Sequence, residues 1–505
     1  MRVALGLRSR WLVCDKSDMT IEEDVESIER RMHELGEELG RLKADKVDVD
    51  VIEGRVLEVA KAWGRAQMAR AMKRADAEAP EVDINGERWG NRRETSHDYE
   101  TVFGTVTLER AVYQQSGRGR VAVPLDLRLG MVEGTYTPRL ARIATRALAS
   151  MPEQEAADLL GEVGTATLSN STIGRLSRAM AARYEQRREI ITTTVREAHV
   201  IPEQAVTVQV GIDGVMVPQD GEHARPRGRK TRSPEPPRHE TRYGVVCDPG
   251  PAAHDGTMGR AWHEGAVGTL AFYDADGERL DTIYLARMPE PHKKTLVGEL
   301  EAELRSVLRE RPTMNVVWAS DGADPQWQAL EGIETRLPPE CTGNRMKLVD
   351  AFHVAEYVQK AADAIWGSGS GDAHVQAATW RETIKSKRDG PAEVLRSMRA
   401  RLGTPRTASG RKELREAIDY IARQNSLGRM KYVEAHRRGY PIGTGVTEAA
   451  AKTVVGSRMK RAGARFSQHG GQTVMLFRAS ILSKRFAALH RELGATYAAR
   501  VKEAA

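Results

Sequence analysis

Three acidic residues far apart in the chain have the surroundings that a phosphoryl-transfer site requires. Asp213 lies in a predicted β-strand, Asp321 follows a short apolar run, and Glu448 begins a predicted helix. Two-metal phosphoryl transfer needs carboxylates from separate elements, which hold two Mg²⁺ ions about 3.5 to 4 Å apart. Neighbouring carboxylates raise one another's pKa, so such a group needs a cation to stay ionised. We therefore expect these three residues to be both catalytic groups and metal ligands, with two Mg²⁺ ions, or Mn²⁺ in their place.

Each acid also has a plainer interpretation. Asp213 and Asp321 both precede glycine, which is typical of turns. Glu448 stands four residues before Lys452, the spacing of an ordinary helical ion pair that contributes about 0.3 to 0.5 kcal/mol. For any single acid the turn or surface interpretation is preferred. The hypothesis depends on all three acids together, each at the end of a predicted core element.

A basic segment follows Glu448. The turn before the glutamate contains proline and two glycines, and either Thr444 or Thr447 is expected to cap the helix that begins there. Three arginines further along recur at i, i+3 and i+7, which places them on one face if the helix continues. This face is predicted to bind a phosphate backbone, although a solvated surface is the alternative. The residues assigned to it are Lys452, Arg458, Lys460, Arg461 and Arg465.

The elements that must position the acids follow from apolar periodicity. From residue 205 the pattern alternates, so that Val208, Val210 and Ile212 share one face of a strand and Asp213 lies on the other. The predicted order is several strands followed by a helix, a strand, a helix and a last strand. This is the order of elements in a ribonuclease-H-like mixed sheet. A doubly wound nucleotide-binding sheet is disfavoured because no glycine-rich loop follows the first strand. The later segments predicted to be strands are 243–248, 265–274, 279–288, 315–320 and 347–350, with a helix at 292–311.

The remaining segments are mostly helical. Residues 20–45 have apolar residues every three or four positions, which predicts an amphipathic helix and a short coiled coil. A β-hairpin is expected at 99–113. Helices within 136–184 fit a DNA-binding helix-turn-helix, with Arg175 and Arg178 facing DNA, and fit a connecting bundle equally well. The closing segment is expected to be a single amphipathic helix at 473–493, and a basic, proline-containing loop at 223–242 is expected to be exposed and near DNA.

These expectations define a multidomain α+β protein, with a helical N-terminal region for DNA binding or oligomerisation and a catalytic core that a helical insertion interrupts. The predicted regions are an N-terminal helical arm (1–95), a β-hairpin element (96–130), a helical region with the possible helix-turn-helix (131–198), the first part of the core (199–353), the insertion (354–439) and the closing part of the core with Glu448 (440–505).

Composition restricts the classes of protein that remain. The 505 residues carry a formal charge of +7, which favours a polyanionic partner when the basic residues are clustered. The three cysteines are far apart, so neither a disulfide framework nor a structural zinc site is indicated, and a reducing cytoplasm is expected. No apolar run is long enough for a membrane span or a signal peptide, so no membrane partner is expected.

Five blocks of the sequence resemble those of a known protein family. The blocks GIDGVMVP, ERLDTIYLARMPE, ASDGADPQW, LVDAFHVAEY and YPIGTGVTEAAAKTVVGSRMKRAGARF are similar to those of the ISKra family of bacterial insertion-sequence transposases, the one numbered four, which are relatives of Mutator-type DDE enzymes. The likeness extends from about Asp98 to Phe486 and covers several blocks in the same order.

The resemblance implies a function and roles for individual residues. It implies a Mg²⁺-dependent DNA transposase that cleaves at the ends of its element and joins them to target DNA. The acidic triad would be Asp213, Asp321 and Glu448. Asp350 and His353 match the family's Asp-x-x-His element, and would orient the site or touch DNA; equally, Asp350 would cap the following helix and His353 would pack beside it. Partners would be transposon-end and target DNA and a second copy of the chain, in a bacterial cytoplasm and on the nucleoid when DNA is bound.

Two other functions remain open, and the sequence differs from the family in one segment. A ribonuclease-H-like nuclease or resolvase would cut without joining, and a non-catalytic regulator derived from a transposase would bind DNA only. Related transposases often carry paired cysteines after the hairpin, whereas this chain has Tyr113-Gln114-Gln115-Ser116-Gly117. We therefore expect no zinc-bound DNA-reading element in that segment.

Overall fold

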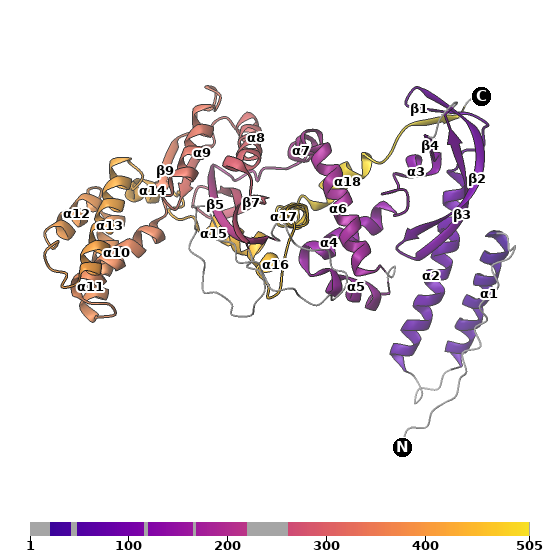
Figure 1. The fold of residues 1–505 in the computed structure, drawn as a ribbon, viewed down its shortest axis with the longest axis horizontal. Helices are drawn as coiled ribbons and strands as arrows, with labels where there is room; N and C mark the ends of the chain where they lie inside the picture. Colours follow the sequence, from indigo (N-terminus) through magenta and orange to yellow (C-terminus); the bar gives the residue numbers. More distant parts are fainter. Residues whose placement is uncertain (1–20, 42–47, 116–119, 165–167, 220–260, 504–505) are drawn as a thin grey trace, which may run out of the picture. The chain divides into compact units, whose positions relative to one another are not determined.

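The chain forms two compact units, each containing helices and a five-stranded sheet, so it is a mixed α+β protein as expected (Figure 1). The computed structural model describes residues 21–41, 48–115, 120–164, 168–219 and 261–503. Unit 1 comprises Met1–Ile191 and Leu489–Ala505, and unit 2 comprises Thr192–Ala488. In the described parts of the chain, no helix is long and apolar enough to cross a membrane.

Unit 1 is built on a long β-hairpin. Its two strands pair from Thr101 and Gly104 at the turn to Gly90 and Gln114 at the far end, which confirms the predicted hairpin and extends it. Gly104 has a φ of +105°, a value that favours glycine at this turn. The strand order is β10-β1-β2-β3-β4. The strands are β1 (Val82–Ile84), β2 (Glu87–Thr101), β3 (Gly104–Gln114), β4 (Val121–Ala122) and β10 (Val501–Glu503).

Helices make up the rest of unit 1. The two N-terminal helices contact each other, and α2 ends at Arg74. Side chains of Asp48, Thr137 and Ser169 each accept a backbone N–H at the start of a helix. The helices are α1 (Ile21–Gly40), α2 (Val49–Arg74), α3 (Pro124–Leu129), α4 (Pro138–Ser150), α5 (Glu153–Glu162), α6 (Asn170–Gln186), α7 (Arg188–Glu197) and α18 (Phe486–Ala495), of which α7 and α18 extend across the unit boundary.

Unit 2 is organised around a mixed sheet with the strand order β7-β6-β5-β8-β9. The first three strands along the chain are antiparallel neighbours, and β8 and β9 then run parallel to β5. The strands are β5 (Thr207–Gln219), β6 (Ala261–Tyr273), β7 (Arg279–Arg287), β8 (Asn315–Ser320) and β9 (Arg345–Val349). The strands expected at 265–274, 279–288, 315–320 and 347–350 are thus present; the strand expected at 243–248 and the basic loop at 223–242 lie outside the described residues.

Helices pack on both faces of this sheet. On one face, Val210 and Trp318 share a buried cluster with Leu300 of α8 (Lys294–Glu310) and Leu330 of α9 (Asp324–Thr335). On the other face, Val217 and Val267 pack with residues of the C-terminal helices. Burial on both faces explains why most positions of β5 are buried, beyond simple alternation. The C-terminal elements are α15 (Gly445–Ala450), the π-helix η3 (Ala451–Gly456), α16 (Ser457–Met459) and α17 (Gln468–Leu482).

A group of helices lies between β9 and α15, coloured orange in Figure 1. Its apolar residues form one cluster with Val317, Leu348 and Val349 of the sheet, so this group is packed on the strand ends that precede the acids. The helices are α10 (Ala351–Trp366), α11 (Gly371–Ser386), α12 (Gly390–Arg399), α13 (Ala408–Ser426) and α14 (Tyr432–Arg437).

The prediction of one closing helix at 473–493 is wrong. The segment forms α17 and α18, separated at Ser483 to Arg485, and Lys484 has a φ of 59°. A residue in the left-handed region ends a helix, because its carbonyl and amide leave the helical hydrogen-bond pattern. Arg485 then forms a buried ion pair with Glu303, which stabilises the break.

Candidate active site

Strand register aligns three aspartates on the neighbouring strands β5, β8 and β9 of the unit 2 sheet. Gly211 of β5 is paired with Ala319 of β8, and Ser320 of β8 with Val349 of β9. Two residues beyond the first pair, the same register places Asp213 opposite Asp321. One residue beyond the second pair, it places Asp321 opposite Asp350. Neighbouring strands are about 4.8 Å apart, so three carboxylates are brought side by side at the carboxyl ends of β8 and β9.

The fourth acid comes from the helix that covers this part of the sheet. Asp213, Asp321, Asp350 and Glu448 all line one open pocket of about 210 Å³. The other residues of its wall are Ile212, Phe352, His353, Glu356, Thr444 and Thr447. The structure therefore brings together the three residues predicted to be catalytic and the two predicted to support them.

Close packing between α15 and β5 places Glu448 above the strand. A Cβ atom on Gly211 would lie 2.2 Å from Oγ1 of Thr447, so only glycine allows the helix to approach this closely. Thr447 exchanges a 2.7 Å hydrogen bond with Thr269 of β6. Gln209 donates a 2.9 Å bond to the carbonyl of Gly443, just before the helix. These contacts fix the first turn of α15, which carries Glu448.

Asp213 has a perturbed pKa. Burial in the strand, followed by the negative charge of Asp321 and more weakly that of Glu448, raises the pKa of Asp213 to about 6. The ammonium group of Lys293 and the backbone N–H of Gly214 act in the opposite direction. The two neighbouring acids are thus close enough to interact electrostatically with Asp213.

The backbone after β8 holds Asp321. Oδ1 of Asp321 accepts a 3.0 Å bond from the amide of Ala323, and its carbonyl accepts a 2.7 Å bond from the hydroxyl of Tyr420 on α13. Gly322 has a φ of +103°, and a Cβ atom there would lie 2.7 Å from the Tyr420 hydroxyl. The loop that carries Asp321 is therefore shaped by a helix about one hundred residues later in the chain.

Asp350 connects the sheet to α15. It is buried, its Oδ1 accepts a 2.7 Å bond from the amide of Phe352, and its Oδ2 accepts a bond from the hydroxyl of Thr444. The predicted helix cap at Asp350 is confirmed. The expected side-chain cap of α15 by Thr444 or Thr447 is wrong, because Thr444 donates to Asp350 instead and Thr447 bonds Thr269.

His353 lies in an aromatic cluster. Its ring makes edge contacts with Tyr357 and Tyr420, which stack at 3.9 Å between ring centroids. Its Nδ1 lies 3.6 Å from Glu356. His353 thus packs beside the helix as the plainer interpretation expected, while it also lines the pocket.

Glu448 is more exposed than Asp213, Asp321 and Asp350. Its side chain is 58% exposed and accepts a 2.5 Å bond from Lys452, the i, i+4 pair that the spacing predicted. Exposed pairs of this kind are weak, so the carboxylate can turn from Lys452 toward the pocket at small energetic cost.

The donor set suits a hard divalent cation, because all four candidate ligands are carboxylates. Within the described ranges, however, no three His, Cys, Asp or Glu side chains are arranged as a ready-made metal-binding group. Burial, and after it the negative charge of Asp321, raises the pKa of Asp213. The residue types thus fit Mg²⁺.

The predicted arginine face of a continuous helix is wrong. The helix widens to a π-helix at η3 and ends at Met459, so the arginines do not share a helical face. Arg458 is buried with its guanidinium 5.4 Å from the centre of the Phe466 ring. Lys460, Arg461 and Arg465 are exposed in the segment that follows.

The arginines of the predicted helix-turn-helix have partners within unit 1. Arg175 donates a 2.9 Å bond to the hydroxyl of Tyr136, and Arg178 forms a half-exposed 3.3 Å ion pair with Glu153. A Cβ atom on Gly174 would lie 2.2 Å from Oε1 of Glu153, so α5 and α6 pack tightly. These contacts are those expected of a packed helical bundle.

Sequence reasoning missed several residues of the pocket wall. Phe352 is 67% exposed beside the acids, and Tyr420 and Thr444 position Asp321 and Asp350. The sequence contains no signal for Phe352, because the exposure of its ring is a property of the tertiary fold. The sequence contains no signal for Lys293 either, because it lies in a short 3-10 helix (Pro291–Lys293) and only the fold brings its charge near Asp213.

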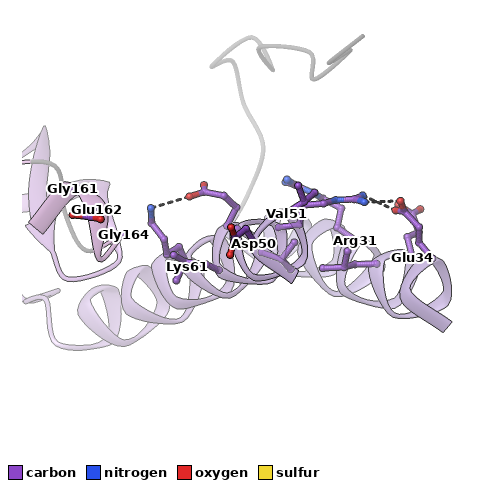
Figure 2. Close-up of a pocket in the computed structure, with 15 residues that line it drawn as sticks. Arg31, Glu34, Asp50, Val51, Lys61, Gly161, Glu162 and Gly164 are labelled. Carbon is purple, nitrogen blue, oxygen red and sulfur yellow. Dashed lines mark hydrogen bonds and ion pairs between the residues drawn. The ribbon is translucent and has the colours of Figure 1, made fainter. Parts of the chain in front are cut away.

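A larger groove of about 750 Å³ in unit 1 has a different character. It runs between α1 and α2 and is lined mainly by charged residues of both signs, among them Arg31, Glu34, Asp50 and Lys61 (Figure 2). Its charges pair with one another, as in the 2.6 Å bond from Arg55 to Glu38. This groove offers no converging catalytic groups.

Comparisons with known proteins provide no family for the chain. No protein-family model and no curated protein matches it.

Proposed function

We propose that the protein is a DDE transposase of an insertion sequence, related to the ISKra family numbered four, with a ribonuclease-H-like core. The reaction would be Mg²⁺-dependent cleavage of DNA at the ends of the element, followed by attack of the freed 3′-hydroxyl on target DNA. The observation that carries the proposal is the convergence of Asp213, Asp321 and Glu448 on one pocket although they are remote in sequence.

The topology supports the proposed core. Three antiparallel strands followed by two parallel ones, in the order β7-β6-β5-β8-β9, agree with a ribonuclease-H-like sheet. In such open sheets, ligands bind beyond the carboxyl ends of the strands, where Asp321 and Asp350 directly follow β8 and β9. Helices α10 to α14 would be the insertion of Mutator-like enzymes between the second aspartate and the glutamate.

The roles of the residues follow from their positions. Mg²⁺ ions held by Asp213, Asp321 and Glu448 would activate the attacking oxygen and stabilise the leaving oxygen. Asp350 would keep α15 in place through Thr444 and thereby position Glu448. The exposed Lys460, Arg461 and Arg465 and the pocket-side Lys452 would bind phosphates of the DNA backbone.

Phe352 would contact a nucleobase. Its ring is largely exposed at the edge of the acidic pocket, and aromatic faces bind unpaired bases without sequence preference, contributing about 1 to 3 kcal/mol per base. Lys385 lies 5.6 Å from the ring centroid, so a phosphate next to that base would meet a positive charge.

Strand cleavage and joining with purified protein test the proposal. Labelled duplexes that carry the DNA flanking the reading frame are incubated with Mg²⁺, and products are separated on denaturing gels. Asp213→Asn, Asp321→Asn and Glu448→Gln should each lower the cleavage rate by at least about 1,000-fold, while DNA binding in Ca²⁺ is kept. Glu356→Gln, a change in another carboxylate of the same pocket, is the matched control and should retain activity.

Other outcomes would identify a different function. Cleavage without joined products would indicate a nuclease or resolvase with the same site. Binding with no Mg²⁺-dependent product on any end sequence would indicate a DNA-binding regulator. Full activity of Asp213→Asn would refute the assignment of the acids.

A further inference from the structure

The N-terminal helical hairpin of unit 1 has an apolar side with no partner among the described residues. Helices α1 and α2 run antiparallel, since Glu38 near the end of α1 bonds Arg55 near the start of α2. Ile28 near the start of α1 packs on Ala62 further along α2. Large apolar side chains remain exposed beside this contact.

The exposed residues of α2 follow a heptad pattern. Val49, Val56 and Trp63 are 62%, 44% and 43% exposed, and they recur every seven residues. Ile52 and Val59, which occupy the intervening positions of the same heptads, are half-buried. β-branched residues at the first apolar heptad position are typical of two-stranded packing. The seam of a coiled coil is thus present on α2, and α1 covers only one edge of it.

Helix α1 contributes to the same side of the hairpin. Met32 is 45% exposed and lies about a quarter turn around α1 from the residues that contact α2. On α2, Val56 and Trp63 lie about a quarter turn from the residues that contact α1. The direction of this turn, viewed from the N-terminus of each helix, is the same as for Met32 on α1. Right-handed helices that run in opposite directions turn oppositely when viewed from one end, so both sets of exposed residues face one side of the hairpin. We call this side the hairpin face; it comprises Met32, Val49, Val56 and Trp63.

The charges of the two helices favour a second copy of the chain as the occupant. Helix α1 contains eight acidic and two basic residues, a formal charge of −6 with histidine neutral. Helix α2 contains six basic and three acidic residues, a formal charge of +3. In a two-fold pair of hairpins, α1 of each copy would lie beside α2 of the other, so acidic helices meet basic ones. A nucleic acid is disfavoured because the acidic α1 borders the hairpin face.

We propose that the hairpin face is a homodimer interface, in which two hairpins form an antiparallel four-helix bundle. The exposed valines and tryptophan would fill the centre of the bundle, as apolar heptad positions do in other bundles. The proposal stands independently of the catalytic function, because it uses no residue of the acidic pocket.

Light scattering coupled to gel filtration of the full-length chain tests the proposal. The unaltered protein should have twice the mass of one chain at micromolar concentration. Val56→Glu should weaken the dimer on the order of 100-fold, because an unpaired carboxylate would be buried in an apolar seam. Val51→Glu is the matched control: it makes the same change in the same helix, at a residue that is 54% exposed and lines the charged groove of Figure 2 instead. It should leave the dimer intact.

Val56→Thr keeps the shape of the side chain and should weaken the dimer less than Val56→Glu does, while circular dichroism verifies that all variants stay folded. A monomeric unaltered protein would overturn the proposal. So would a folded Val56→Glu protein that remains a dimer, or a Val51→Glu protein that dissociates equally.

Discussion

At the scale of single residues, Asp213 shows how this site is assembled at the expense of stability. It lies inside a strand rather than at a surface turn, and burial together with Asp321 raises the pKa of Asp213 to about 6. A strand interior positions a carboxylate more rigidly than a loop does, which benefits a group that must hold its geometry.

The stability of the protein should therefore depend on Asp213 and on pH. Between the ordinary pKa of 3.8 and the folded-state value of about 6, the folded protein holds more protons than the unfolded chain, so stability falls as pH rises through this window. Above pH 6 the loss is complete. Asp213→Asn should raise the free energy of unfolding by about 1 to 2 kcal/mol at pH 7.5, a value reduced for partial exposure, and by almost nothing near pH 4.

Urea denaturation at the two pH values measures this difference. Asp276→Asn, in an exposed turn of the same unit, serves as the control and should show a smaller difference between the two pH values. An equal effect of Asp213→Asn at pH 4 and pH 7.5 would contradict the electrostatic explanation.

Gly322 is the second residue whose chemistry is decisive. Its φ of +103° and the 2.7 Å approach of the Tyr420 hydroxyl both exclude a side chain. Gly322→Ala should lower the free energy of unfolding by about 2 kcal/mol or more and disturb the backbone that carries Asp321. Gly298→Ala on α8, where nothing lies within 4 Å of the added methyl group, should be neutral or stabilising by up to about 1 kcal/mol. Thermal melting of the two variants gives the comparison, and equal losses would exclude this account.

At the scale of elements, helix α13 positions the loop after β8. Tyr420 donates to the carbonyl of Asp321, and Arg423 bonds Asp324 at the start of α9. Arg429, just beyond α13, lies 3.9 Å from the centre of the Trp327 ring. A helical segment remote in sequence thus holds the second aspartate.

Tyr420→Phe should therefore reduce activity with little loss of stability. The stacking on Tyr357 is kept while the hydrogen bond to Asp321 is lost, which lowers the free energy of unfolding by about 1 kcal/mol. Under the proposed function, kcat for cleavage should fall about 10-fold with an unchanged KM for DNA, as expected of a positioning residue. Tyr357→Phe keeps the same stack and is the control; a kcat that falls equally in both variants would argue against the Asp321 contact.

The strands that position the aspartates were predictable, whereas the helix after Glu448 was not. Alternation around Val210 and the apolar run before Asp321 are local patterns, and the structure places strands at both. The prediction that the arginines share one helical face assumed a regular period of 3.6 residues per turn. The π-helix η3 adds a residue to its turns and shifts the register, so that Arg458 points into the core. Arg458 lies over the Phe466 ring there, and no local pattern predicts the change of register.

Contacts between remote segments had no signal in the sequence either. Thr444 bonds Asp350 and Tyr420 bonds Asp321 across 94 and 99 positions of the chain. Composition and spacing identify the residue types that suit a site, but such pairs are defined only by the tertiary fold. For the same reason the exposed Phe352 was unremarked until its neighbours were known.

At the scale of the whole molecule, the chain returns to unit 1 after completing unit 2. Strand β10 pairs with β1, and Oε2 of Glu503 accepts bonds of 3.1 and 3.0 Å from the amides of Glu78 and Ala79. Oε1 of Glu503 is paired with Arg128 at 2.8 Å. The last described residues thus stabilise the edge of the first sheet.

Removal of residues 496–505 should loosen that edge selectively. Amide exchange in the segment 78–85 should become faster by at least about 10-fold, because β1 loses a paired strand and two amides lose their acceptor. Exchange in β8 should be unchanged, since it belongs to unit 2. Hydrogen exchange read by mass spectrometry localises the effect, and uniform loosening of both units would contradict it. Glu503→Gln tests the same contacts with a smaller perturbation.

The interruption of unit 1 by unit 2 also sets an order of events during translation. All residues of the acidic pocket leave the ribosome before Leu489, where the final part of unit 1 begins. A nascent chain can therefore complete its pocket while its first sheet still lacks a border strand. The first sheet gains β10 only after residues 501–503 have been synthesised, so a ribosome that pauses just before them would carry a chain whose second unit is finished and whose first unit is still open.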